Sequence, residues 1–459
     1  MKDKMLGKLA VGILFGVIIT IGVFLLTYNI LLSLLSLITT FLIIFEFKKD
    51  PFLPVFLYLV KFLIFYVLAA VVYFSIYSDK YNIYSLASFY LLLSLIFFYT
   101  GYKSNIGRFI GYKIPYFNLN LNSERATIAI ILSFSLGLIS LMLIFYLNGG
   151  FLNFITYLAN RSRLIQGIGP LRVMVDYIGL SAIIGFVGIH TCYRRSYKAK
   201  VFVYLLIAMW LLVTIILGGR GYFLWQIFTF LFIYHFLGKK IKFRTIFPIA
   251  IVLIIFLFVS AEIRANMYAI LGKGQYERIG ENIINLKEPA YIVKRNFPFF
   301  DVFSSIVETV PAYYPFYYGK TYLQTLTAII PRALWPNKPF GVASEVAYLL
   351  YGLRFYHSRD LTDFQTGPAV RLIDEAYLNF SFPGIILAFF LYGIIMKVFT
   401  VYLYFNHKDT NVVLICSLFF PFVIYHLDGN SFMNMIRLFG YSSMIIFLLI
   451  TLKGKLVKR

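Results

Sequence analysis

Residues 329–339 read Ile329-Ile330-Pro331-Arg332-Ala333-Leu334-Trp335-Pro336-Asn337-Lys338-Pro339, and they decide how the chain is organised. They lie in its only long polar segment, Glu262–Phe382, which separates a long apolar region from a shorter one. The three prolines exclude a continuous helix, because each lacks a backbone donor and biases the preceding residue toward extended backbone. The cations and the indole between them have two interpretations. In the first, Arg332, Lys338 and Trp335 belong to an interfacial loop that is anchored among lipid headgroups. In the second, they form a site for phosphate oxygens, which suit the planar donor fork of arginine.

The composition is that of a membrane protein. Of the 459 residues, 61% are hydrophobic and only 13% are charged, whereas about a quarter of the residues of a soluble globular protein are charged. The net charge of +23 does not indicate a nucleic-acid partner, because the cations lie between apolar runs and not on a soluble face. Cys192 and Cys416 form neither a metal-binding signature nor a disulfide framework. We expect no metal and no cofactor.

Twelve apolar runs predict membrane-spanning helices, since a helix needs about 20 mainly apolar residues to cross ~30 Å of hydrocarbon. The runs are Leu6–Thr27, Ile30–Phe47, Phe52–Tyr77, Tyr84–Thr100, Ala126–Leu147, Val173–Tyr193, Val201–Leu217, Tyr222–Leu237, Thr245–Ala261, Gly384–Phe405, Val412–Leu427 and Met433–Leu452. They predict an all-α polytopic membrane protein with about 12 transmembrane helices. Residues 1–261 would form an N-terminal bundle of about nine helices, residues 262–382 one long extracytoplasmic loop with short interfacial helices, and residues 383–459 about three further helices.

Lysine and arginine are concentrated at alternate ends of these runs, which the positive-inside rule assigns to the cytoplasm. These cations are Lys2, Lys4, Lys8, Lys48, Lys49, Lys103, Arg108, Lys113, Arg125, Arg194, Arg195, Lys198, Lys200, Lys239, Lys240, Lys242, Arg244, Lys408, Lys453, Lys455, Lys458 and Arg459. We therefore expect both termini in the cytoplasm and the protein in the cytoplasmic (inner) membrane. The long loop would then face the extracytoplasmic side.

Four arginines occur on the opposite side, against this trend. Arg161, Arg163 and Arg172 lie close together between two predicted spans, and Arg220 is flanked by glycines in the stretch Gly218–Gly221. They are either solvated loop residues with surface partners or cations placed to bind an anion at the membrane surface. The glycines favour the second interpretation for Arg220, because they remove side-chain bulk and let a ligand approach closely.

The long loop does not have the composition of a disordered tail. It holds a cluster of aromatic residues at 313–318 and an amphipathic run, Thr321–Ile330, which we expect to lie in the membrane interface. Further on, Arg371 would face Asp374 and Glu375 if this stretch is helical, because the spacings are three and four. Either these residues form a local ion pair, or a carboxylate at the membrane boundary serves as a catalytic base.

Ionisable residues also occur inside or beside the predicted spans, where charge is costly and therefore marks candidate functional sites. Arg437 is the strongest candidate, and His426 and Asp428 precede it in the sequence. Lys61 lies in the middle of a span without an evident role. Lys397 is expected to reach the cytoplasmic surface along its aliphatic stem.

Several of these stretches together resemble the O-antigen polymerase family, the oligosaccharide repeat unit polymerases of Wzy type. The resemblance rests on the run Ile330–Pro339, on Thr366-Gly367, on Glu375-Ala376-Tyr377-Leu378-Asn379-Phe380 and on the glycine-flanked Arg220. It covers most of the chain in topology and about a tenth of it in motif. One departure is Ser381, because relatives tend to have glycine directly after Asn-Phe.

The resemblance implies a membrane glycosyltransferase with two substrates linked to polyprenyl diphosphate, a glycan chain as donor and a single repeat unit as acceptor. A chain-length regulator and a flippase are candidate protein partners. Glu375 would accept the proton of the acceptor hydroxyl, with Asp374, Asp363 and His357 as alternatives. Arg332 and Arg220 would act in catalysis through the diphosphate. The residues expected to bind the diphosphate or the glycan are Arg161, Arg163, Lys338, Trp335, Arg371, Arg437 and Asn379.

Two other functions stay open from the sequence. An O-antigen ligase, which hands the chain to a different acceptor, would share this topology and the phosphate-binding arginines. A lipid-linked oligosaccharide flippase would distribute polar residues along many spans to line an alternating cavity, and most of the predicted spans have none.

Overall fold

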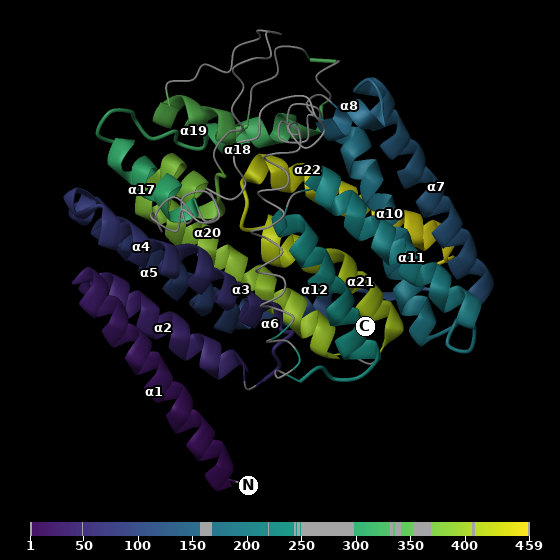
Figure 1. Ribbon diagram of the computed structural model, residues 1–459, viewed down its shortest axis with the longest axis horizontal. Helices are drawn as coiled ribbons and strands as arrows, with labels where there is room; N and C mark the ends of the chain where they lie inside the picture. The colour runs from purple at the N-terminus through teal and green to yellow at the C-terminus, as the bar shows by residue number, and fades with distance from the viewer. Residues whose placement is uncertain are drawn as a thin grey trace.

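The structure is a computed structural model that describes residues 2–47, 49–156, 168–218, 220–242, 245, 248, 298–330, 334–335, 341–351, 369–405 and 409–457. These residues form long helices and one short antiparallel pair of strands (Figure 1). In the first half of the chain the elements are α1 (Lys2–Thr27), α2 (Ile30–Phe47), α3 (Pro54–Phe62), the π-helix η1 (Leu63–Leu68), α4 (Ala69–Ile76), the 3-10 helix η2 (Ser78–Lys80), α5 (Tyr81–Lys103), α6 (Asn105–Lys113), β1 (Tyr116–Asn118), α7 (Ser123–Leu147), α8 (Phe151–Thr156), α10 (Gly169–His190), α11 (Tyr197–Val213), the π-helix η4 (Thr214–Gly218) and α12 (Arg220–Leu237). In the second half they are α17 (Phe299–Thr309), α18 (Lys320–Leu326), the 3-10 helix η5 (Thr327–Ile329), α19 (Val342–Tyr351), α20 (Leu372–Phe405), α21 (Thr410–Pro421), the π-helix η6 (Phe422–His426), α22 (Ser431–Thr451) and β2 (Lys455–Val457).

The helices confirm an all-α membrane protein. Within the described residues, 8 helices are long and apolar enough to cross a membrane: Ile30–Phe47, Pro54–Ile76, Tyr81–Lys103, Ser123–Leu147, Gly169–His190, Tyr197–Leu217, Leu372–Tyr404 and Asn434–Thr451. Shorter apolar helices run over Gly16–Thr27, Gly221–Leu237 and Thr410–His426. The 8 candidate spans match eight of the predicted ones, and the shorter apolar helices overlap three others. Most of the predicted span Thr245–Ala261 lies outside the described residues, and the number of 12 spans stays a prediction.

Helix α20 begins earlier than the predicted span. It starts at Leu372, inside the predicted loop, and is interrupted by non-helical backbone at Phe380 and Ser381 before it continues to Phe405. Ser381 has φ 56 and ψ −143, a conformation that glycine adopts readily and other residues rarely do. Pro383 stands in the first turn after this kink, where its missing N–H group is not needed. The carboxylates near Leu372 and the span therefore belong to one kinked helix.

Ser381→Gly is expected to stabilise the protein by about 1 kcal/mol, because glycine removes the strain of a side chain at positive φ. Ser140→Gly in the regular helix α7 is the matched control, and it is expected to destabilise by a similar amount. Thermal unfolding of both variants in detergent measures the difference. If Ser381→Gly lowers the midpoint as much as the control does, the kink is not a source of strain.

Glycines let the central helices pack closely. Helix α5 lies along α20, and α7 lies along α10. A Cβ atom at Gly101 would collide with the carbonyl oxygen of Phe390, and one at Gly393 with that of Phe98, so the α5–α20 pair depends on both glycines. Such close backbone contact is the usual way that helices associate where lipid supplies no hydrophobic driving force.

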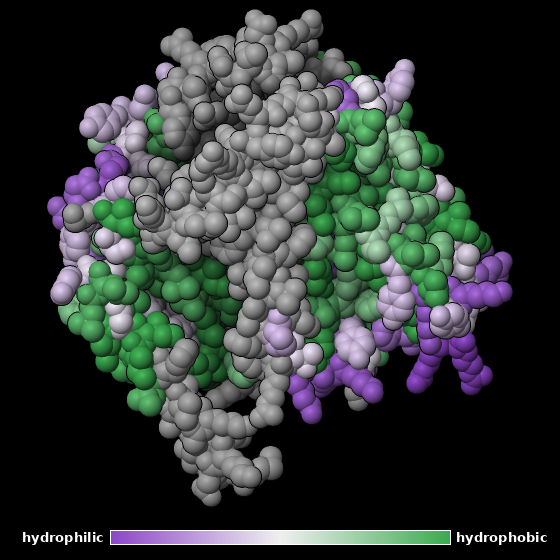
Figure 2. Space-filling view, in the orientation of Figure 1, coloured by the Kyte–Doolittle hydropathy of each residue, from purple (hydrophilic) through white to green (hydrophobic). Residues whose placement is uncertain are grey.

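The ends of the helices that carry the cations meet at one end of the bundle. Glu46 at the end of α2 pairs with Lys49 at 2.7 Å and with Lys103, at the end of α5, at 3.2 Å. His235, near the end of α12, lies 3.2 Å from Asp50. Strand β2, near the C-terminus, pairs with β1, which lies between α6 and α7. Figure 2 shows strongly hydrophilic residues along the lower right edge of the molecule, below a broad hydrophobic surface, and a further group at the left.

The opposite end of the bundle carries the described part of the long loop. Lys80 in η2 pairs with Glu308 in α17 at 2.7 Å, and α18 packs against the start of α22. In Figure 1 α17, α18 and α19 lie in the upper part of the molecule, whereas the N-terminus lies at its lower edge. The long loop is thus a folded cap on one end of the bundle where the structure describes it.

Candidate functional site

A cavity of about 260 Å³ lies at this capped end, between α12, the start of α20, η6 and α22. Its lining residues are Tyr222, Ala369, Val370, Arg371, Tyr425, His426, Gly429, Asn430, Asn434 and Arg437. Among these described residues there are two guanidinium groups and no carboxylate. The volume is just below the ~300–1,000 Å³ of pockets that enclose a drug-sized ligand. The cavity therefore suits a small anionic group better than a whole oligosaccharide.

A buried acid holds one of the two guanidinium groups in place. Asp176 accepts a hydrogen bond from Nη1 of Arg172 at 2.6 Å and another from Nη1 of Arg437 at 2.5 Å. Arg172 and Asp176 stand one turn apart on α10, whereas Arg437 comes from α22. Both guanidinium groups also lie over the ring of Tyr222, at 5.7 and 5.3 Å. Two cations share one carboxylate, so this group of three residues keeps a net positive charge beside the cavity.

Arg371 reaches the cavity from the start of α20. Its backbone bridges to Gly429, and its N–H group donates to Asp374 at 2.6 Å, so Asp374 caps the first turn of the helix. The guanidinium group lies over the rings of Phe299 at 4.0 Å and Tyr425 at 5.3 Å. Aromatic faces stabilise a cation without neutralising it.

The carboxylate of Glu375 is fully buried and ties three elements together. Its Oε1 accepts from the hydroxyl groups of Thr321 at 2.8 Å and Ser431 at 2.5 Å, and its Oε2 accepts from the N–H group of Ser431 at 2.6 Å. The contacts therefore join α18, α20 and the start of α22. The predicted local ion pair between Arg371 and Glu375 is not what holds this carboxylate. Ser431 follows the cavity residue Asn430, so Glu375 stands directly behind the cavity wall.

Asn379 supports the same arrangement from one turn further along α20. Its Nδ2 group donates to Thr321 Oγ1 at 2.6 Å, and its Oδ1 accepts from the N–H group of Gly319 at 2.9 Å. Both ends of the amide are thus occupied by protein groups, and the residue is buried. In this structure Asn379 holds the entry to α18 and does not line the cavity.

The structure brings together only some of the predicted site residues. Arg371 and Arg437 line one cavity, and Glu375 stands behind it. Arg220 is the first residue of α12, and Trp335 is 39% exposed. The remaining predicted residues, Arg161, Arg163, Arg332 and Lys338, and the alternative bases Asp363 and His357, lie outside the described residues.

Several lining residues were not singled out from the sequence. Tyr222, Tyr425, Asn430 and Asn434 carry no signal of their own, because neutral polar residues are common near membrane interfaces. Asp176, however, could have been found, since an acid in an apolar run is costly and Arg172 stands four residues before it.

His426 adds a group that a ligand could use. Its Nε2 atom has no hydrogen-bond partner among the described residues, although the ring lies 5.5 Å from that of Tyr222 and lines the cavity. Buried polar groups are normally satisfied. A hydrogen-bonding ligand in the cavity would satisfy this one.

Comparison with known proteins places the chain in a family. The family model described as a domain of unknown function (DUF8712) matches residues 151–459, which is more than half of the chain and includes every residue that lines the cavity. No curated protein and no solved structure matches the chain.

Proposed function

We propose that this chain, which belongs to the DUF8712 family, is a membrane glycosyltransferase that polymerises oligosaccharide repeat units linked to polyprenyl diphosphate. Its product would be a surface polysaccharide, assembled on the outer face of the cytoplasmic membrane. The observation that carries the proposal is the cavity at the capped end of the bundle, which Arg371 and Arg437 both line, with no carboxylate among its described lining residues. The resemblance of the Pro-Arg stretch and of the Glu375 motif to O-antigen polymerases supports the same function.

The cavity fits the diphosphate of such a substrate. A diphosphate carries negative charge at the headgroup level of the membrane, and arginine binds phosphate oxygens through two parallel hydrogen bonds. Arg437 is fixed by Asp176 and Arg371 by aromatic rings, so both groups are oriented before a ligand arrives. Two of the helices that form the cavity, α20 and α22, contain candidate membrane spans. A polyprenyl tail could therefore remain in the membrane while its diphosphate occupies the cavity.

In the proposed reaction the bond between the anomeric carbon and the diphosphate oxygen of the donor breaks. The acceptor hydroxyl oxygen forms the new bond to that carbon and loses its proton, and polyprenyl diphosphate leaves with the electron pair. Arg371 and Arg437 would stabilise the negative charge that develops on the leaving group. Glu375 is our candidate for the proton acceptor, since it stands behind Asn430. A substrate hydroxyl would then have to replace one of the donors that Glu375 now has.

Purified protein incubated with lipid-linked repeat units tests the proposal. A ladder of products that each differ by one unit is the expected result. Transfer of a preformed chain to another lipid without a ladder would indicate the ligase. Movement of the lipid-linked substrate across a vesicle membrane without any transfer would indicate the flippase. Against that function, the buried Arg172, Asp176, Arg371 and Arg437 lie at or beside one cavity, whereas the buried acids Glu46 and Asp50 lie at the other end of the described bundle.

The proposed orientation places the capped end outside and both termini in the cytoplasm. It is supported by the cations at the other end of the bundle, through the positive-inside rule. Tyr313 and Tyr197 give a matched test, since each is 79% exposed and they belong to opposite ends. We expect Tyr313→Cys to react with an impermeant thiol reagent added to the outer face of the membrane, and Tyr197→Cys to react only after permeabilisation. The reverse pattern would overturn the orientation.

A further inference from the structure

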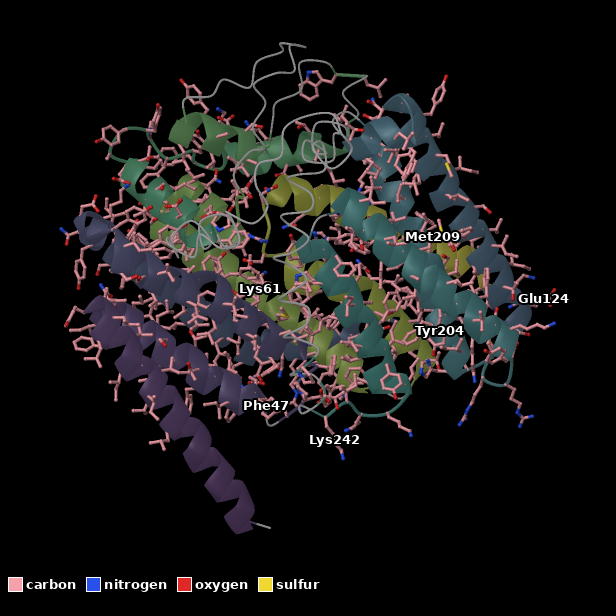
Figure 3. The ribbon with its side chains drawn as sticks, viewed as in Figure 1. Phe47, Lys61, Glu124, Tyr204, Met209 and Lys242 are labelled. Atoms are coloured by element: carbon pink, nitrogen blue, oxygen red, sulfur yellow. The ribbon has the colours of Figure 1, made fainter. Side chains whose placement is uncertain are left out.

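Lys61 is a buried cation in the interior of the apolar span Pro54–Ile76, which α3, η1 and α4 form together. It is 4% exposed, and Figure 3 shows it inside the molecule, well above Phe47 and Lys242 at the lower edge. Its ammonium group lies 2.6 Å from Oδ2 of Asp428 and donates to the carbonyl oxygen of Ile424 at 3.0 Å. A lysine at such a place is costly unless it has specific partners. Both partners belong to the segment that leads into the cavity wall.

This segment includes the π-helix η6. Its backbone hydrogen bonds run to the fifth residue back, as from the Leu427 N–H group to the Phe422 carbonyl oxygen at 2.8 Å. Single π-helical turns inside α-helices occur frequently at functional sites. Two carbonyl oxygens of η6 accept from side chains of other helices: Val423 from the hydroxyl group of Tyr392 at 3.0 Å, and Ile424 from Lys61.

The two residues that follow Ile424 line the cavity. They are Tyr425, whose ring also supports the guanidinium of Arg371, and His426. A cation near the last carbonyl groups of a helix both hydrogen-bonds them and complements their partial negative charge. Lys61 meets this description, although it stands 363 residues before Ile424 in the chain.

We infer that Lys61 is a positioning residue, which fixes η6 through the Ile424 carbonyl group and so sets the place of Tyr425 and His426 in the cavity wall. Its ion pair with Asp428 is the second anchor, at the far end of the same segment. The consequence for ligand binding rests on the proposed function, because it assumes that the cavity takes a diphosphate. The placement of Tyr425 by Lys61 does not depend on that assumption.

Trp225 reports on Tyr425 directly, since their rings lie 6.2 Å apart. The chain has 3 tryptophans, so protein labelled with 5-fluorotryptophan gives a ¹⁹F spectrum in which Trp225→Phe identifies the Trp225 resonance. We expect Lys61→Met to shift or broaden this resonance. Lys397→Met is the matched control: Lys397 is also a lysine in a membrane helix, but its ammonium group lies over the ring of Tyr102, 5.1 Å away. We expect this control to leave the Trp225 resonance unchanged.

A second variant separates positioning from simple charge balance. Lys61→Met leaves Asp428 as a buried charge without its partner, which destabilises a protein strongly, whereas Lys61→Met with Asp428→Asn removes both charges. We expect the double variant to fold like the unmodified protein and still to show the displaced Trp225 resonance, because Ile424 lacks its donor. An unshifted Trp225 resonance in the double variant would overturn the inference, since Lys61 would then only neutralise Asp428.

Binding of inorganic pyrophosphate to the same proteins, followed by titration calorimetry, tests the consequence for the cavity. We expect the double variant to bind about five- to tenfold more weakly than the unmodified protein, as expected for the loss of about one hydrogen bond. Equal affinity together with a displaced Trp225 would refute the effect on binding. If the unmodified protein binds no pyrophosphate, the proposed function fails, and the ¹⁹F result still decides whether Lys61 positions η6.

Discussion

Replacing Arg437 by alanine is expected to slow chain extension about 10²–10³-fold, the usual loss when one preorganised donor to a developing negative charge is removed. Arg437 lines the cavity, and Asp176 holds its Nη1 atom at 2.5 Å. A guanidinium group has several N–H donors, so those that do not contact Asp176 can bind a ligand. The measurement is the rate of ladder growth with purified protein and lipid-linked repeat units.

Arg437→Lys separates charge from geometry. One edge of a guanidinium group can bind Asp176 while the other faces the cavity, whereas a single ammonium group satisfies only one of them well. We therefore expect the lysine variant to be nearly as slow as the alanine variant. Arg108→Ala is the control, because Arg108 is exposed on α6 and donates only to Tyr112 within its own helix among the contacts described. Normal ladder growth from folded Arg437→Ala protein would remove this cavity as the reaction site.

The membrane helices could be predicted from the sequence because a bilayer imposes a simple requirement. A span needs about 20 apolar residues whatever its neighbours are, so the ends of α2 at Ile30 and Phe47 agree with the apolar run. The beginning of α20 could not be found in this way. Hydropathy falls across Asp374 and Glu375, but the helix continues because these acids find partners in the folded protein.

The candidate site was only partly predictable for a related reason. Arg437 could be recognised as a candidate site residue without knowledge of its partners, because a charged residue in a membrane span is costly and usually functional. Its partner Asp176 lies 261 residues away in the chain, and no local sequence pattern predicts that the two residues form a pair. The spacing rule for helices suggested that Arg371 would pair with Glu375. In the structure the carboxylate of Glu375 instead contacts residues 54 and 56 positions away, Thr321 and Ser431.

The residue at the kink of α20 illustrates what a resemblance can supply. Ser381 stands where the O-antigen polymerases that this stretch resembles tend to have glycine, and its φ of 56 is one that glycine adopts without strain. The resemblance therefore drew attention to the start of this helix, whereas the positive φ is seen only in the structure.

Glu375→Gln is expected to slow chain extension ~10²–10⁴-fold if Glu375 accepts the proton of the acceptor hydroxyl, since an amide cannot take it. The substitution also changes the hydrogen bonds of this buried side chain. A carboxylate accepts from all three donors, the two hydroxyl groups and the N–H group of Ser431. Glutamine would turn an NH₂ group toward one of them, and an unsatisfied buried donor costs about 1–3 kcal/mol. Loss of activity alone therefore does not distinguish catalysis from support.

Thr321→Val and Ser431→Ala supply the comparison, because each removes one donor from Oε1 of Glu375 and leaves the carboxylate in place. If Glu375 only joins α18, α20 and α22, the rates of all three variants should follow their thermal stabilities on one line. If it accepts a proton, Glu375→Gln should fall far below the line set by the other two, with pyrophosphate binding almost unchanged. We expect the second pattern. Points for all three variants on a single line would show that Glu375 acts through the structure, and the proton acceptor would then have to be another group at the cavity.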